Sequence, residues 1–249
     1  MKKILYFFSI FVFVLPVVAY SAAPVVSPEQ ILRNCDDVRL PNTDYRMLVE
    51  VEDYKADDSK RIALYEVLVK GRDKTLIKTL KPKIDRGTTL LMLKYDLWVY
   101  MKTISKPLRI SLRQRLFGQV ANGDIARANF SGDYDPTLLR QENLNGREYY
   151  VLNLAAKNNK VTYQKVILWV DKENYHPLKA EFYAVSGKLL KTCEYKNFRK
   201  MMGKMRPTLL VLKNPLSPKE YSLLKYLKME SAKLPDRYFS RDYLRRLRY

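Results

Sequence analysis

The sequence of 249 residues has one histidine, His176, and two cysteines. A single histidine excludes any metal site built on two or more histidines and the HExxH type of zinc enzyme. A Ser-His-acid triad is possible only through His176, whose place before Pro177 is typical of an ordinary histidine in an exposed turn. The sequence also has no phosphate-binding P-loop and no GxGxxG after a strand-like run. It therefore predicts that the protein is not an enzyme.

Other ligand chemistry is equally sparse. Asp133 and Asp135 offer two carboxylates, but the remaining ligands of a calcium loop are missing. We therefore expect no metal and no cofactor, and we expect this pair to cap a following helical turn. Cys35 and Cys193 have no neighbouring base that would activate a thiolate. A disulfide between them and two buried thiols are both open alternatives.

Acidic residues and long apolar runs are both scarce. There are 26 Asp and Glu against 46 Lys and Arg, which gives a net charge of +20. The main apolar run, residues 4–19, follows Lys2 and Lys3 and precedes a stretch of small residues. This pattern predicts a cleavable signal peptide over residues 1–23, followed by a single exported domain over residues 24–249, with a retained membrane anchor as the alternative.

Most of the positive charge belongs to that exported domain. The predicted signal peptide removes only two lysines and no acids, so 20 minus 2 leaves a net charge of +18. Export argues against nucleic acid as a partner. The basic surface then suits anionic lipid headgroups, an acidic partner surface, or solubility alone.

What the sequence does contain is a series of strand-like runs separated by tight turns. Residues 165–191 hold three such runs, and Gly187 suits a turn that requires positive φ. From Tyr45 to Val51 apolar and polar residues alternate, as in a strand with one buried face, whereas residues 61–70 are apolar on both faces. The pattern predicts an α+β protein made mainly of antiparallel β-strands, in a strongly curved sheet or partial barrel.

Two segments depart from the strand pattern. Ser27 and Pro28 predict a capped helix start, and apolar residues at helical spacing continue to Val38. Residues 102–146 interrupt the sheet, and an interruption of this length is usually functional or mobile. Within it, residues 135–139 are predicted to form a capped helical turn.

The run VILWVDKENYHPLKAEFYAVSGKLLKT, over residues 166–192, resembles the outer-membrane lipoprotein-sorting protein family, the LolA-like proteins. The matching residues are Trp169, Asp171, Pro177, Leu178, Lys179, Tyr183, Gly187 and Lys188. Three further pieces agree in the same order, namely LWVYM at 97–101, SGDYDPTLL at 131–139 and LPDRYFS at 234–240. The resemblance extends over residues 28–245.

The resemblance implies an open half β-barrel of about eleven strands, LolA/LolB-like, with helices over the concave face and a hydrophobic cavity for acyl chains. It also implies a monomeric periplasmic carrier that moves lipoproteins or other lipids toward the outer membrane. Its partners would be an inner-membrane transporter of the RND or ABC type and, transiently, a membrane. The alternative is an envelope sensor or interaction module that binds a partner protein, such as an RND-type exporter, without carrying lipid.

Strand alternation selects the residues that we expect at the wall of the cavity. They are Met47, Val49, Val51, Leu64, Leu91, Leu93, Trp98, Tyr100, Leu152, Leu154, Ile167, Trp169 and Phe182. Five arginines are expected to contact lipid headgroups or a partner, with plain solvation as the alternative. They are Arg109, Arg113, Arg115, Arg245 and Arg246.

Overall fold

The computed structural model describes residues 26–127 and 129–246, so the predicted signal peptide lies outside the described residues. The helices are α1 (Pro28–Arg39), α2 (Asn122–Ala126), α3 (Phe130–Asp133) and α4 (Arg241–Arg246), with short 3-10 helices η1 (Lys83–Asp85) and η2 (Asp236–Tyr238). The strands are β1 (Tyr45–Tyr54), β2 (Lys60–Lys70), β3 (Lys74–Lys81), β4 (Thr89–Leu93), β5 (Asp96–Tyr100), β6 (Leu108–Ile110), β7 (Arg115–Phe117), β8 (Val120–Ala121), β9 (Tyr134–Leu144), β10 (Arg147–Ala156), β11 (Lys165–Asp171), β12 (Pro177–Tyr183), β13 (Leu189–Met201), β14 (Lys204–Asn214) and β15 (Ser217–Ser231).

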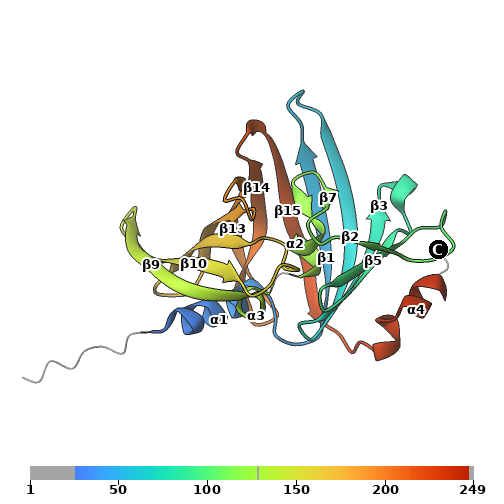
Figure 1. Cartoon of the computed structure of the whole chain (residues 1–249), viewed down its shortest axis with the longest axis horizontal. Coiled ribbons are helices and arrows are strands. Elements are labelled where there is room, and N and C mark those ends of the chain that lie inside the picture. The colour runs from blue at the N-terminus through green and yellow to red at the C-terminus, as the bar shows by residue number, and fades with distance from the viewer. Residues whose placement is uncertain (1–25, 128, 247–249) are drawn as a thin grey trace, which may run out of the picture.

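Thirteen strands form one curved, open, antiparallel sheet (Figure 1). Their order is β6-β5-β4-β3-β2-β1-β15-β14-β13-β12-β11-β10-β9, and β7 pairs with β8 in a separate hairpin. The sheet does not close, because β6 and β9 lie at its two opposite edges. The predicted fold of mainly antiparallel strands in an open half-barrel is therefore confirmed, with thirteen strands in the sheet instead of about eleven.

The strand order explains why a long segment interrupts the sheet. Strands β1 to β6 form one meander and β9 to β15 form another, and the two meet where β1 pairs with β15. The chain leaves the sheet at the β6 edge and returns at the β9 edge. Residues 111–133, called the crossing segment here, therefore pass over one face of the sheet (Figure 1).

That face, the inner face, carries the main hydrophobic core. Alternate residues of each strand point to it, such as Met47, Val49 and Val51 of β1. Side chains of α1 and of the crossing segment pack against the same cluster, including Ile31, Leu32, Cys35, Leu112, Val120, Ile125, Ala126 and Phe130. The opposite, outer face is covered over β4 and β5 by α4.

Helix α1 forms where the capping signals predict it. The Ser27 hydroxyl oxygen accepts a hydrogen bond from the backbone N–H of Gln30 at 3.2 Å, and Pro28 occupies the first turn. Ile31, Leu32 and Cys35 then fall on one buried stripe. The helix thereby presents an apolar face to the sheet.

The helical turn predicted at residues 135–139 is wrong. These residues belong to β9, an edge strand that pairs with β10 along its whole length. Pro136 is compatible with this place because an edge strand has a side on which no N–H is needed. Asp133 does not cap a following turn either; its carboxylate accepts hydrogen bonds from the Arg127 guanidinium and from the Tyr95 hydroxyl.

Candidate functional site

Six of the thirteen residues predicted at the cavity wall share the inner face. They are Met47, Val49, Val51, Leu152, Leu154 and Phe182, and all six are buried in the main core. They come from β1, β10 and β12, strands that are distant in the sequence. The structure therefore brings these six together under α1 and the crossing segment.

The other seven do not lie in this cluster. Four of them, Leu91, Leu93, Trp98 and Tyr100, pack on the outer face with Leu244 of α4. Ile167 and Trp169 pack on the outer face with Tyr149 and Val151. Leu64 is half-buried and belongs to none of the hydrophobic clusters on either face. The thirteen residues therefore do not form one common wall, because only six of them share the inner face. These strands are apolar on both faces, so alternation alone does not identify the inner one.

The inner face is filled mainly by the protein's own side chains. Below the crossing segment lies a cavity of about 40 Å³, lined by Phe130, Tyr134, Tyr163, Phe182 and Tyr195, among others. Ligand pockets usually measure roughly 300–1,000 Å³. In this arrangement the cavity has room for about one or two water molecules and not for an acyl chain.

A buried ionic pair holds the crossing segment to the sheet. The Lys191 ammonium of β13, which is 4% exposed, contacts the Asp124 carboxylate of α2 and donates a hydrogen bond to the Gln119 carbonyl at 3.2 Å. Asp124 also accepts hydrogen bonds from the Tyr163 hydroxyl at 2.8 Å and from the Ala121 backbone N–H at 2.7 Å. Burial and the neighbouring carboxylate raise the pKa of Tyr163, so this phenol stays protonated and keeps donating.

The turn of the β7–β8 hairpin has a second attachment point. The Gln119 backbone N–H donates to the Ser222 hydroxyl at 2.9 Å, and that hydroxyl donates to the Asp53 carboxylate at 3.0 Å. Asp53 is fully buried and pairs with Arg61 at 2.8 Å. Burial alone would raise the pKa of Asp53, but its bonds to Arg61, a lysine and Ser222 lower it overall. The carboxylate is therefore ionised at neutral pH and fixes the hairpin in place.

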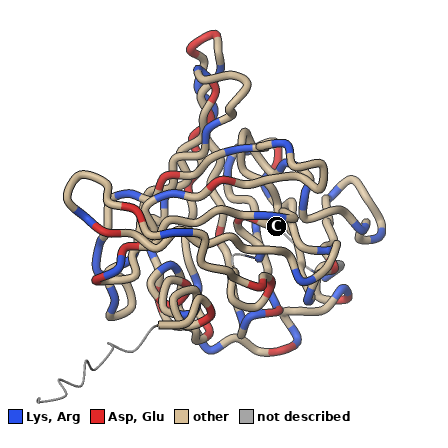
Figure 2. Tube along the Cα trace, turned by 60° about the vertical axis from the view of Figure 1, so that its left-hand side comes forward, with Lys and Arg blue, Asp and Glu red and all other residues tan. Residues whose placement is uncertain are grey.

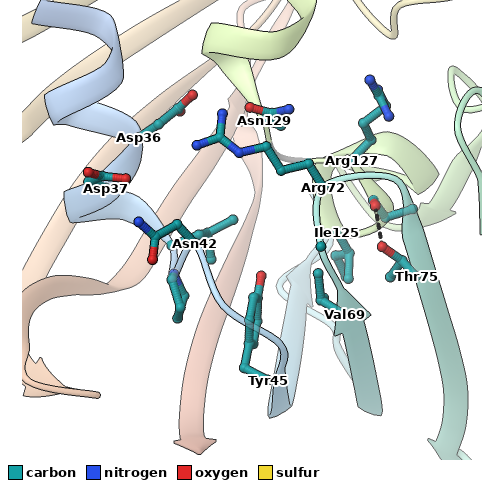
Figure 3. Close-up of a pocket in the computed structure, with 14 residues that line it drawn as sticks. Asp36, Asp37, Asn42, Tyr45, Val69, Arg72, Thr75, Ile125, Arg127 and Asn129 are labelled. Carbon is teal, nitrogen blue, oxygen red and sulfur yellow. Dashed lines mark hydrogen bonds between the residues drawn. The ribbon is translucent and has the colours of Figure 1, made fainter. Parts of the chain in front are cut away.

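A small mouth with both charged and apolar side chains in its wall opens beside the end of α1 (Figure 3). It measures about 60 Å³ and lies between α1, the β2–β3 turn and the α2–α3 region. The Thr75 hydroxyl donates to the Ala126 carbonyl at 2.8 Å, and the Arg127 guanidinium pairs with Asp133 at 2.6 Å. Arg127 lines both this mouth and the inner cavity. The ion pair thus separates two small spaces, neither of which is large enough for a lipid.

A larger groove lies at the β6 edge, where the crossing segment leaves part of the inner face open. This apolar groove measures about 420 Å³ and runs between β4 to β6 and β7. Its apolar side chains are Leu90, Val99, Ile110 and Leu116, and Thr88, Gln114, Arg115 and Asn122 complete it. Leu90 and Val99 belong to the main core, so the groove is an accessible extension of the inner face.

A basic groove of about 400 Å³ continues from the apolar one. The two grooves share Ile110 and Gln114 in their walls. The basic groove is lined by Arg109, Arg113 and Lys160, together with Tyr95, Asn159 and the rest of residues 110–114. The structure therefore places an apolar surface and a cluster of cations next to each other.

The predicted headgroup arginines fall into two places. Arg109 and Arg113 line the basic groove and Arg115 lines the apolar one, so these three are neighbours. Arg109 pairs with Asp96, and Arg113 donates to the Asn159 carbonyl at 2.6 Å. Arg246 is exposed in α4 on the outer face, while the side chain of Arg245 lies outside the described residues.

The only histidine, His176, is half-buried against an aromatic ring. The His176 ring stacks on Phe198 at 4.2 Å between ring centroids, and burial lowers the pKa of the imidazole. Within 26–127 and 129–246, no group of three or more His, Cys, Asp or Glu is arranged to hold a metal ion. No helix in the same ranges is long and apolar enough to cross a membrane.

Both cysteines are buried, unbonded thiols, and burial raises the pKa of Cys193 to about 12. We therefore expect a thiol reagent such as DTNB to leave the native protein unmodified at neutral pH, because the thiolate is scarce and inaccessible. Unfolding in guanidinium chloride should then release both thiols. A protein that stays unreactive after unfolding, yet reacts after reduction, would instead contain the disulfide that the sequence left open.

Sequence reasoning missed the polar attachments of the crossing segment. Asp124 and Lys191 are 67 positions apart, and neither belongs to a local motif. Leu116 and Ile110, in contrast, lie in an aliphatic stretch that also carries the predicted arginines. The mixture of aliphatic residues and arginines in this stretch could therefore have predicted the groove, whereas no sequence pattern predicts the ionic pair.

Comparison with solved structures identifies relatives of this fold. A LolA superfamily protein from Nitrosomonas europaea is 46% identical, with a TM-score of 0.85, over 88% of this chain and 100% of that chain. An outer membrane lipoprotein-sorting protein domain from Vibrio parahaemolyticus is 24% identical, with a TM-score of 0.74, over 88% and 98% of the two chains. A DUF1329 family protein from Desulfovibrio piger is 21% identical, with a TM-score of 0.76, over 88% and 100%.

The last two similarities concern the fold alone, since both identities are below 25%. None of the curated proteins compared with the chain matches it. A family model described as "Uncharacterized protein" matches residues 71–246. With 46% identity over the full length of the Nitrosomonas europaea protein, the chain belongs to the LolA superfamily.

Proposed function

We propose that the protein is a periplasmic carrier that binds the acyl chains of lipoproteins or other lipids for transport toward the outer membrane. The observation that carries the proposal is the apolar groove of about 420 Å³ at the β6 edge, with the basic groove beside it. The groove is shallow and open to solvent, and most of its lining is apolar. Membership of the LolA superfamily supports the same role, and the predicted signal peptide supports the location.

The chemistry of the groove suits an acyl chain with an anionic headgroup. Each methylene that leaves water for the side chains of Leu90, Val99, Ile110 and Leu116 gains about 0.8 kcal/mol. Arg115 at the same groove, and Arg113 and Lys160 in the basic groove next to it, offer charged donors for phosphate oxygens. Arg109 pairs with Trp98 across the β5–β6 ladder, so its side chain lies on the outer face, where it pairs with Asp96. Binding would then require burial and ion pairing only, with release by handover to a partner.

The proposal predicts that Leu116→Glu loses uptake of a fluorescent fatty acid by at least about tenfold, because a carboxylate in the groove must be desolvated when the chain binds. Fluorescence titration of the purified protein measures the effect. Leu227→Glu is the matched control, since Leu227 is exposed on β15 and does not line either groove. Its uptake should stay within about twofold of the wild type.

Lipid extraction followed by mass spectrometry provides an independent check, and acyl species should accompany the purified wild type. A protein that is reproducibly free of lipid and takes up no fatty acid would overturn the proposal. If that lipid-free protein instead captured one envelope protein in a stoichiometric complex, the interaction-module alternative would replace the carrier.

A further inference from the structure

Two neighbouring loops form a basic corner beside the apolar groove. The basic corner consists of residues 81–88, from the last residue of β3 to the start of β4, and residues 101–109, from the end of β5 into β6. Because Thr89 pairs with Tyr100, the two loops start side by side at the same end of β4 and β5. Figure 1 shows both on the side of the sheet away from the β9 edge.

The corner has a strong local excess of positive charge. Lys and Arg occur along the whole trace with Asp and Glu between them, so a charged surface must be judged by its local balance (Figure 2). The corner has six exposed cations and one acid, Asp85. The cations are Lys81, Lys83, Arg86, Lys102, Lys106 and Arg109. Among the described residues, Lys81, Lys83, Arg86 and Lys106 have no ion-pair partner.

The corner also exposes two large apolar side chains. Ile84 is 90% exposed, the highest value among the exposed large hydrophobic residues of the described chain, and Leu108 is 51% exposed. A single projecting aliphatic side chain between lysines offers no packed centre of the kind that protein interfaces use. It does suit insertion at the level of lipid headgroups, where cations pair with anionic lipids and the apolar side chain enters the acyl boundary.

The corner is continuous with the groove. Leu108 pairs with Val99 across the β5–β6 ladder, so both side chains lie on the inner face of the sheet. Val99 and Ile110 line the apolar groove, and so does Thr88 of the first loop. An apolar surface therefore runs from the exposed Leu108 into the groove. A bilayer held at the corner would face the groove's entrance.

We infer that the basic corner is a docking surface for an anionic phospholipid bilayer and aligns the apolar groove with the membrane. The inference rests on the proposed carrier function, because contact with a membrane would serve to load or unload a carried lipid. Arg246, exposed on the α4 helix that packs against β4 and β5, adds a cation near the same part of the sheet. The charge balance favours an anionic membrane over a zwitterionic one.

Vesicle flotation with the full chain tests the inference. Wild type should bind vesicles that contain roughly one-third phosphatidylglycerol and should bind pure phosphatidylcholine much more weakly. High salt should weaken the binding, because it screens the charges. Lys83→Glu with Arg86→Glu should reduce binding by about thirtyfold, and Ile84→Ser with Leu108→Ser by about tenfold. All four side chains are exposed, and thermal unfolding checks that the variants are folded.

The matched control moves the same charge change to the opposite end of the strands. Arg199 and Lys200 are exposed beside the β13–β14 turn, so Arg199→Glu with Lys200→Glu changes the net charge equally. This variant should keep vesicle binding within about threefold of the wild type. An equal loss in the control, or no preference of the wild type for phosphatidylglycerol, would overturn the docking surface.

The outcome for the docking surface is separable from that for the carrier. Fatty-acid uptake is measured in solution on the same variants, where no bilayer is present. If the wild type takes up fatty acid but binds neither type of vesicle, the docking surface is refuted and the carrier function is not affected. A wild type that binds anionic vesicles through the corner but takes up no fatty acid supports the docking surface and refutes the carrier.

Discussion

Gly118→Ala is expected to lower the free energy of unfolding by about 3 kcal/mol, because it combines backbone strain with overpacking. Gly118 sits in the β7–β8 turn at φ +57°, a region that residues with a Cβ avoid. A Cβ at this position would overlap the buried Asp53 carboxylate and the Ser222 hydroxyl. Neither can move away cheaply, since Asp53 is held by Arg61 and Ser222 by the Gln119 backbone.

Gly71→Ala separates the two contributions. Gly71 has nearly the same φ, +59°, but no atom lies within 4 Å of a Cβ built there. Its variant should cost about 1 kcal/mol, the backbone part alone. Urea unfolding followed by circular dichroism measures both variants. Equal losses of unfolding free energy in the two variants would show that the hairpin turn is not packed against Asp53, and therefore that Asp53 does not fix the crossing segment.

The position of the β7–β8 turn also affects the wall of the apolar groove. Arg115 and Leu116 reach the groove from β7, three and two residues before Gly118. A displaced hairpin would therefore change the groove wall even in protein that remains folded. For this reason Gly118→Ala should weaken fatty-acid uptake, whereas Gly71→Ala should leave it unchanged, because Gly71 lies in neither groove wall.

The sequence identifies the inner face of a strand only where the residues of the other face are polar. In β1 the residues between the inner positions are polar, such as Arg46, Glu50 and Glu52, so alternation identifies the inner face correctly. In β4 the run TLLML is apolar at nearly every position, and its outer face is covered by α4. Leu90 and Leu91 are then equivalent in the sequence, although only Leu90 lies on the inner face.

The prediction at β9 failed for a related reason. An Asp-Pro-Thr start followed by two leucines satisfies the local rules for a helix N-terminus. Pairing with β10 overrides them, because β10 has a long unpaired side that β9 completes. Such long-range pairing has no local signal. The same holds for the partner of Lys191, which only the folded chain brings to it.

The largest remaining expected effect concerns that partner. Lys191→Met should lower the free energy of unfolding by about 3–5 kcal/mol, as is usual when one member of a buried ion pair is removed. The Asp124 carboxylate would stay in the core without its cation, and the Gln119 carbonyl would lose a donor. Methionine keeps the length of the side chain, so the loss reports mainly the charge.

Two comparisons make this prediction decisive. Lys196, on the same strand, is half exposed and pairs with Glu194 at 2.6 Å, so Lys196→Met should cost less than about 1 kcal/mol. Combining Lys191→Met with Asp124→Asn should recover part of the loss, since the amide leaves no uncompensated charge in the core. Equal costs at Lys191 and Lys196, or no recovery in the double variant, would contradict a buried ionic attachment. A large and recoverable cost would show that the Lys191–Asp124 pair, which only the folded chain assembles, is one of the attachments that hold the crossing segment beside the proposed groove.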